Sequence, residues 1–334
     1  MSSSAVLPGH LSFFHNTQAD VKRAYGTQRQ AILSVSKAKK ALATISSWPN
    51  YQATELHRLT GMAAQANVGQ IYYKDESTRF GLKSFKALGG AYAVTRFLQQ
   101  HLAELNGEEP TMVQLLSGQY KEQLKDVVVS CATDGNHGRS VAWGAQMFGC
   151  QCIIYIHRDV STGRQKAMED LEATVNRVSG NYDESLQICI EDAGKNNWYV
   201  ISDTSYEGYT KYPRYIMAGY NVMAEEIIDQ IKDRPLPTHV FLQGGVGSFP
   251  GAICGYFWEK FPGNNIKFVV VESEHAPCLI RSAQNNQMTS VNITRETMMA
   301  GLSCGEPSLL GWEILKSGAD DFITINDSSI PGLM

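Results

Sequence analysis

Residues 127–156, VVVSCATDGNHGRSVAWGAQMFGCQCIIYI, alternate between strand-like and helix-like patterns. The β-branched run at 127–131 is typical of a buried strand, and CIIYI at 152–156 is a second run of the same kind. The stretch between them, from 138 to 148, repeats apolar side chains at helical spacing. A strand, a helix and a second strand in this order predict parallel strands joined by a crossover helix.

The same alternation extends towards the C-terminus. Pro235 and Pro237 interrupt it before a second strand-helix-strand unit begins. Strand-like runs lie at 174–178, 198–202, 239–243 and 267–271, and helix-like patterns at 163–173, 184–195, 214–232 and 252–260. The predicted fold class is therefore α/β, with two open, mostly parallel twisted sheets flanked by helices.

Composition excludes several classes of function. Hydrophobic residues at 43%, charged residues at 19% and a net charge of −4 describe a globular protein that favours neither nucleic acid nor an anionic membrane as partner. The polar start predicts no secretory signal, and no apolar run approaches the roughly 18 residues of a membrane span. The seven cysteines lack C-x-x-C spacing, so we expect no metal site, and their odd number favours reduced thiols in a cytosol.

A glycine-rich turn follows the strand-like run at 239–243. Its glycines let the backbone approach an anion closely, and the N–H groups at the start of the next helix can donate to that anion. No Gly-Lys-Ser/Thr follows, and no acidic residue is well placed to hold a ribose, so the turn is not a nucleotide P-loop. We predict a phosphate site at Gly244–Ser248, with a tight structural turn as the alternative.

A second glycine turn, Thr133-Asp134-Gly135-Asn136-His137-Gly138, follows the first strand and opens its helix. It combines a carboxylate, an amide and an imidazole, although Asp134 or Asn136 could instead be a helix cap. Asp203 follows the strand-like run at 198–202 in the same way. Because ligands gather at the carboxyl ends of parallel strands, we expect these side chains to face a ligand.

Lys86 lies in KDESTRFGLKSFKALGGAYAV, residues 74–94, among apolar and small neighbours. A lone lysine is usually a solvated surface charge, but these neighbours predict an amine that points into a packed region. A desolvated lysine loses proton affinity, and the neutral amine is the form that attacks an aldehyde. A buried amine, a phosphate site and carboxylates at strand ends together suit pyridoxal phosphate as the cofactor.

Five segments resemble a known family, the diaminopropionate ammonia-lyases. These are pyridoxal-phosphate enzymes of fold type II, which share the fold of the tryptophan synthase β-subunit. Threonine dehydratases share only the Ser-Phe-Lys, Gly-Asn-His and glycine-loop elements, whereas Asp134 and Asp203-Thr204 favour the lyases. The segments are YKDESTRFGLKSFKALGGAYA, CATDGNHGRSVAW, SDTSYEGYTKYPRYIMAGY, THVFLQGGVGSF and MAGLSCGEPSLLGWEIL.

The resemblance implies a role for each site residue. Lys86 would bind the cofactor as an imine, with Phe85 packed beside the ring and Asn136 bonded to the phenolic oxygen. Asp134 and Asp203 would be bases that act on opposite enantiomers of the substrate. The residues implied to hold the phosphate are Gly244, Gly245, Val246, Gly247 and Ser248.

The implied reaction is α,β-elimination of ammonia from D- and L-2,3-diaminopropionate, followed by hydrolysis to pyruvate and a second ammonia. The resemblance also implies a cytoplasmic homodimer of amino-acid catabolism, with the cofactor between two lobes. We expect residues 1–77 and 213–334 to form the larger, phosphate-binding lobe. Residues 78–212 would form the smaller lobe, with a polar surface insertion near 101–125.

The family pattern continues beyond Met334, where this sequence stops. In this fold group the region that follows supplies a hydroxyl against the pyridine nitrogen. We therefore expect weak binding of pyridoxal phosphate or slow turnover by the 334-residue chain. Two alternatives stay open, a serine or threonine dehydratase of the same fold and a non-catalytic remnant that keeps the fold.

Overall fold

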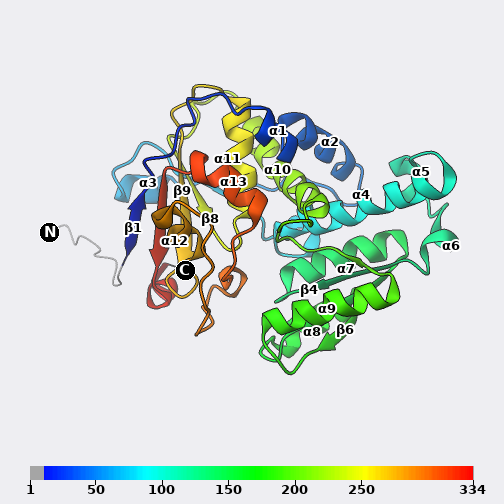
Figure 1. Ribbon diagram of the computed structural model, residues 1–334. Helices are drawn as coiled ribbons and strands as arrows, with labels where there is room; N and C mark the ends of the chain where they lie inside the picture. The colour runs from blue at the N-terminus through cyan, green and yellow to red at the C-terminus, as the bar shows by residue number, and fades with distance from the viewer. Residues whose placement is uncertain (1–10, 334) are drawn as a thin grey trace. The chain divides into compact units, whose positions relative to one another are not determined.

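The structure is a computed structural model that describes residues 11–333 (Figure 1). The chain forms two compact units. Unit 1 takes the described residues within Met1–Val35, Thr204–Thr210 and Leu236–Met334, and unit 2 comprises Ser36–Asp203 and Lys211–Pro235. Unit 2 thus combines most of the predicted smaller lobe with residues 36–77 and 213–235, which were expected in the larger lobe. The lobe boundaries that the family resemblance implies stay a prediction.

The main sheet of unit 2 has four parallel strands in the order β6-β5-β4-β7. The strands are β4 (Val128–Ala132), β5 (Gln151–Ile156), β6 (Thr174–Arg177) and β7 (Tyr199–Val200). β7 is shorter than the run at 198–202 predicted, because the carbonyl of Ile201 contacts the His137 side chain instead of a neighbouring strand. The parallel order confirms the strand-helix-strand prediction for this part of the chain.

Helices cover both faces of this sheet. Right-handed crossovers put α7 and α8 on one face and α9 on the other, and Figure 1 shows α7 and α9 on opposite sides of β4. α9 begins where Asn181 and Glu184 form a reciprocal capping box, and its buried Cys189 packs against Ala132 and Tyr155. The helices are α7 (Asn136–Phe148), α8 (Thr162–Glu169) and α9 (Tyr182–Asn196).

Two long helices of unit 2, α4 (Lys86–Asn106) and α10 (Lys211–Ile231), cross with their backbones in close contact. A Cβ atom at Gly219 would lie 2.0 Å from the carbonyl oxygen of Leu88. A Cβ atom at Gly89 would lie 2.4 Å from the ring of Tyr220. Only glycine fits at these two positions, and the crossing fixes the first turn of α4, where Lys86 lies.

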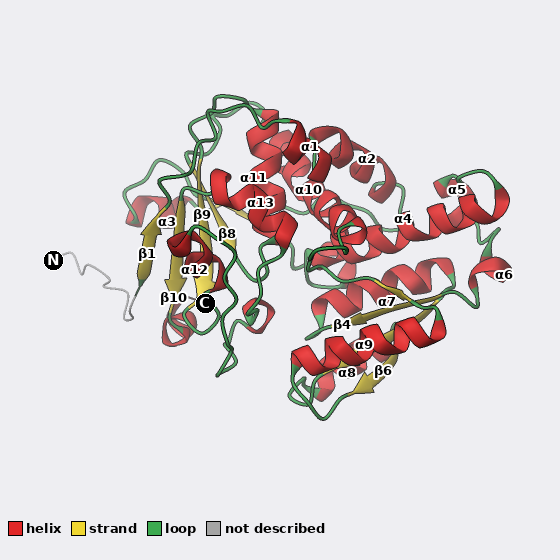
Figure 2. Cartoon of the chain, in the orientation of Figure 1, coloured by secondary structure: helices red, strands yellow, loops and turns green. Residues whose placement is uncertain are grey.

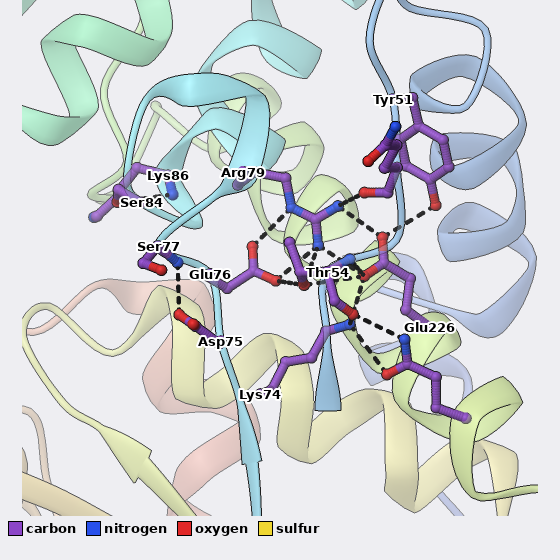
Figure 3. Close-up of polar contacts among 12 residues, drawn as sticks. Tyr51, Thr54, Lys74, Asp75, Glu76, Ser77, Arg79, Ser84, Lys86 and Glu226 are labelled. Atoms are coloured by element: carbon purple, nitrogen blue, oxygen red, sulfur yellow. Dashed lines mark hydrogen bonds and ion pairs between the residues drawn. The ribbon is translucent and has the colours of Figure 1, made fainter. Parts of the chain in front are cut away.

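A buried ionic cluster joins residues 51–79 to α10 (Figure 3). The Arg79 guanidinium donates to both carboxylate oxygens of Glu226, at 2.8 and 2.7 Å, and to Glu76. Lys74 Nζ lies 2.7 Å from Glu226, and the Tyr51 hydroxyl donates to the same carboxylate. These contacts explain why residues 36–77 and α10 belong to one compact unit.

The remainder of unit 2 consists of short elements. The predicted insertion near 101–125 contains no strand, but it is less superficial than expected, because Leu102, Leu115 and Leu124 are buried. The short elements are α2 (Val35–Ile45), whose first residue belongs to unit 1, β2 (Leu56–Arg58), α3 (Thr60–Gln65), β3 (Tyr72–Lys74), the 3-10 turn η1 (Arg79–Gly81), α5 (Met112–Leu116) and α6 (Lys121–Leu124).

Unit 1 contains a second sheet in the order β1-β10-β9-β8. β8, β9 and β10 are parallel, and β1 joins the edge in the antiparallel direction. Figure 2 shows that helices flank the strands of each unit, and the predicted α/β class is confirmed. The strands are β1 (Ser12–His15), β8 (His239–Gln243), β9 (Lys267–Ser273) and β10 (Asp321–Ile325).

The helices of unit 1 pack on this sheet and on one another. α11 and α13 meet at two glycines, since a Cβ atom at Gly251 would lie 3.0 Å from the backbone of Gly311. No helix within residues 11–333 has the length and apolar character needed to cross a bilayer. The elements are α1 (Thr27–Ile32), α11 (Ser248–Lys260), α12 (Cys278–Asn285), η2 (Ala300–Leu302), α13 (Leu309–Gly318), η3 (Asp327–Ser329) and α14 (Ile330–Leu333).

Candidate active site

Lys86 is the first residue of α4, and α7 holds it in place. The Ser140 hydroxyl donates to the carbonyl oxygen of Lys86 at 2.7 Å and accepts from the Ala91 N–H at 2.9 Å. The Lys86 N–H donates to the Ser84 hydroxyl at 3.2 Å. The Lys86 side chain is 22% exposed, so the amine is mostly buried, as predicted, yet keeps a route to solvent.

Asp203 holds the Lys86 amine. A carboxylate oxygen of Asp203 contacts Lys86 Nζ in a short ion pair, and His137 Nδ1 lies 3.9 Å from the same oxygen. The other ring nitrogen of His137 lies 2.7 Å from the Ile201 carbonyl oxygen. The start of α4, the segment after β7 and the start of α7 thus bring an amine, a carboxylate and an imidazole together.

Burial and charge set the protonation of this trio. Burial alone would raise the pKa of Asp203, but the charge of Lys86 outweighs it and holds this pKa well below its usual range. Burial lowers the pKa of His137 more than the neighbouring Asp203 raises it. Asp203 is therefore a carboxylate and His137 a neutral imidazole at neutral pH.

Two aromatic rings flank the amine. Phe85 and Tyr220 meet edge to face with their ring centroids 5.1 Å apart. Lys86 Nζ lies 5.8 Å from the Phe85 ring centroid and 5.9 Å from that of Tyr220. The sequence predicted Phe85 at the site but not Tyr220, because an aromatic residue inside a helix usually packs in a core.

Asp134 and Asn136 lie at the carboxyl end of β4. Neither residue caps α7, so the helix-cap alternative was wrong. The Thr133 hydroxyl accepts from the N–H groups of Gly135 and Gly138 instead, at 3.0 and 3.2 Å. The Asp134 side chain is 25% exposed and Asn136 is exposed, which leaves both polar groups accessible to a ligand.

The predicted phosphate loop, Gly244–Ser248, connects β8 to α11 in unit 1. Gly245 and Gly247 have φ angles of 64° and 97°, which favour glycine, and α11 begins directly afterwards at Ser248. A Cβ atom at Gly244 would lie 2.6 Å from the Glu272 side chain. The loop therefore places glycine backbone at a helix start that no described side chain caps, which is the geometry that binds phosphate groups.

A cluster of buried hydroxyls supports this loop, and one of its members, Ser308, was not predicted from the sequence. The Ser308 N–H donates to the Val246 carbonyl oxygen at 2.7 Å. The Ser308 hydroxyl lies 3.1 Å from the Ser248 hydroxyl and 2.6 Å from that of Ser205. Ser308 thus ties the loop to residues 204–210, which directly follow Asp203.

Glu272 is a structural residue of unit 1. Its carboxylate accepts from the N–H groups of Leu279 and Ile280, at 2.9 and 2.7 Å, at the start of α12. Burial raises its pKa to about 8. Within residues 11–333, no group of three or more histidine, cysteine or acidic side chains is arranged to hold a metal ion.

The residues present fit pyridoxal phosphate. The cofactor needs an accessible amine for its aldehyde, and Lys86 provides one with a carboxylate and aromatic rings beside it. It also needs a phosphate site, and Gly244–Ser248 has the helix start and positive φ angles for this purpose. Among the site residues predicted in unit 2, Phe85 and Asp203 both lie beside Lys86. Asp134 instead contacts His157.

Comparison with known proteins gives the family. Residues 48–331 match the model of the pyridoxal-phosphate dependent enzymes. The diaminopropionate ammonia-lyase of Salmonella typhimurium is 37% identical over 311 residues, which cover 92% of this chain and 77% of that protein. The crystal structure of the holo enzyme of this name from Escherichia coli matches with a TM-score of 0.85 at 35% identity, covering 96% of this chain and 78% of that chain.

A second crystal structure of the Escherichia coli enzyme contains an aminoacrylate-PLP azomethine reaction intermediate. It matches with a TM-score of 0.82 at 34% identity, covering 96% of this chain and 77% of that chain. The family model thus spans most of the sequence. The relatives are similar to this chain in fold and in more than a third of the aligned residues. The chain belongs to the pyridoxal-phosphate dependent enzyme family, alongside the diaminopropionate ammonia-lyases.

Proposed function

We propose that this chain catalyses the α,β-elimination of ammonia from 2,3-diaminopropionate. One water is consumed, and the products are pyruvate and two molecules of ammonia. The observation that carries the proposal is the contact between Lys86, at the start of α4, and the Asp203 carboxylate, which lies beside His137. The relatives at 37% identity, which are diaminopropionate ammonia-lyases, support the choice of substrate.

Each site residue has a task in this proposal. Pyridoxal phosphate, when bound, supplies the electron sink that stabilises negative charge on the substrate Cα. Lys86 Nζ would be its covalent attachment point, and Gly244–Ser248 would hold its phosphate through backbone N–H groups. Phe85 would pack beside the cofactor ring, and Asn136 would donate to its phenolic oxygen.

Asp134 and Asp203 are the proposed bases, one for each enantiomer of the substrate. They follow different strands, β4 and β7, so their carboxylates can approach the substrate from different directions. Asp203 paired with an ammonium is a weak base, because that charge lowers its pKa. The pair with Lys86 must therefore open before Asp203 takes a proton.

The two alternative functions are not favoured. A serine or threonine dehydratase would eliminate water, but the relatives at 37% identity carry the name of an ammonia-lyase. A non-catalytic remnant would have no need for Lys86, Asp134 and Asp203, all of which are present. We further propose a cytoplasmic homodimer that acts in amino-acid catabolism, as the family resemblance suggests.

An absorption spectrum tests the proposal. We expect pyridoxal phosphate added to the purified chain to give the band of a lysine-bound cofactor, and 2,3-diaminopropionate to change that band and release pyruvate. The variant Lys86→Ala lacks the amine, so it should show neither the band nor the pyruvate. A chain that binds the cofactor but releases pyruvate only from serine would instead be a dehydratase.

A further inference from the structure

His157 contacts Asp134, although no sequence pattern singled it out. It follows β5 directly, as Asp134 follows β4, and β4 and β5 are parallel neighbours. Both side chains therefore lie at the carboxyl edge of the sheet. His157 Nε2 lies 3.0 Å from Oδ1 of Asp134. This oxygen is buried and has no aligned hydrogen-bond donor among the described residues, so the imidazole is the polar group packed against it.

The backbone determines which ring nitrogen carries the proton. The Asp159 N–H donates to His157 Nδ1 at 3.3 Å, so Nδ1 accepts and carries no proton. A neutral imidazole then has its proton on Nε2, the nitrogen that faces Asp134. The Nε2 side of the ring therefore faces the carboxylate.

The loop that carries His157 is held firmly. The His157 side chain is 8% exposed, so it has little room to rotate. The guanidinium of Arg177, the last residue of β6, donates to the carbonyl oxygens of His157, Arg158 and Val160, at 3.3, 2.8 and 2.7 Å. A third strand end thus fixes the ring in front of Asp134.

We propose that His157 is a positioning residue that orients the Asp134 carboxylate for proton transfer. By holding Oδ1, it leaves Oδ2 directed at the substrate and keeps the carboxylate in one rotamer. The inference rests on the proposed function, in which Asp134 is the base for one enantiomer. Turnover of that enantiomer alone should therefore depend on His157.

Kinetics on each enantiomer test this dependence. We expect His157→Leu to lower kcat for the enantiomer that Asp134→Asn identifies by about 100-fold, because a misplaced group of this kind costs that much. KM and the rate on the other enantiomer should stay unchanged. His157→Gln, whose amide can donate to the same oxygen, should restore much of the rate. The exposed His239→Leu is the matched control.

Imidazole ¹⁵N spectra test the contact without turnover, in the chain with and without pyridoxal phosphate. We expect the His157 signal, assigned from its loss in His157→Gln, to show the Nε2–H tautomer and to shift in Asp134→Asn. The proposal fails if His157 carries its proton on Nδ1, or if folded His157→Leu loses activity equally on both enantiomers. A chain inactive on both enantiomers contradicts the proposed function, while the spectra still decide whether His157 orients Asp134.

Discussion

At the scale of single residues, Asp203 and Asp134 differ in their partners, and the difference can be measured. Asp203 pairs with Lys86, whereas Asp134 contacts His157. We expect Asp203→Asn to lower kcat on one enantiomer of 2,3-diaminopropionate by about 10²–10⁴-fold, because an amide cannot accept the Cα proton. Asp134→Asn should have the same effect on the other enantiomer. Equal losses on both enantiomers in each variant would contradict the assignment of one base to each.

The sequence predicted Lys86 and Asp203 separately, but not their contact. They are 117 positions apart, and only the rule that strand ends share an edge suggested that both would face a ligand. His157 and Tyr220 were not predicted, because a histidine after a strand or a tyrosine inside a helix is usually structural. Their importance comes from neighbours that only the folded chain brings to them.

At the scale of elements, the crossing of α4 and α10 depends on glycine. In Gly219→Ala the new methyl group would lie 2.0 Å from the Leu88 carbonyl oxygen, so the helices must separate. We expect a loss of about 3 kcal/mol in the free energy of unfolding, the upper part of the range for overpacking. Urea denaturation followed by circular dichroism measures it.

The matched control is Gly194→Ala in α9, where nothing lies within 4 Å of the added methyl group. Alanine is the better helix former, so this variant should gain about 0.5–1 kcal/mol. If Gly219→Ala and Gly194→Ala changed the free energy of unfolding in the same direction, backbone contact between α4 and α10 would not limit the packing. Gly219→Ala should also weaken cofactor binding, because Lys86 opens α4.

Elements with strong patterns were predicted well, and weakly patterned ones were not. The strand-like run at 239–243 became β8 with the same bounds. β1 was missed because its four residues alternate poorly and are stabilised by antiparallel pairing with β10, near the other end of the chain. Pairing over such a distance leaves no local signal for an edge strand.

At the scale of the whole molecule, the α/β class followed from the alternation of strands and helices, whereas the compact units did not. Arg79 and Glu226 are 147 positions apart, and their ion pair is nearly completely buried. Because a charged residue is usually exposed, nothing in the sequence pattern indicated that these segments are joined. The ionic cluster of Figure 3 thus determines part of the organisation that periodicity could not predict.

This cluster also predicts how the stability of the molecule depends on pH. Burial would raise the pKa of Glu226, but hydrogen bonds and charge from Arg79 and Lys74 outweigh it and lower the pKa below 4.5. A carboxyl whose pKa is lower in the folded state stabilises the protein above its unfolded pKa. That contribution is lost as the pH falls through the folded value. The chain should therefore lose stability below about pH 4.5, where unfolded glutamate begins to bind protons.

Glu226→Gln tests this directly. At pH 7 the variant leaves two buried cations with less negative charge around them, and we expect it to lose about 3–5 kcal/mol in the free energy of unfolding. It should also show a shallower decline between pH 5 and pH 3 than the parent chain, because one of the titrating carboxyls is gone. Glu122→Gln is the control, since Glu122 is 87% exposed in its pair with Lys125 and such pairs contribute little. Urea midpoints at each pH decide the matter, and parallel pH profiles for the parent and Glu226→Gln would show that the acid sensitivity arises elsewhere.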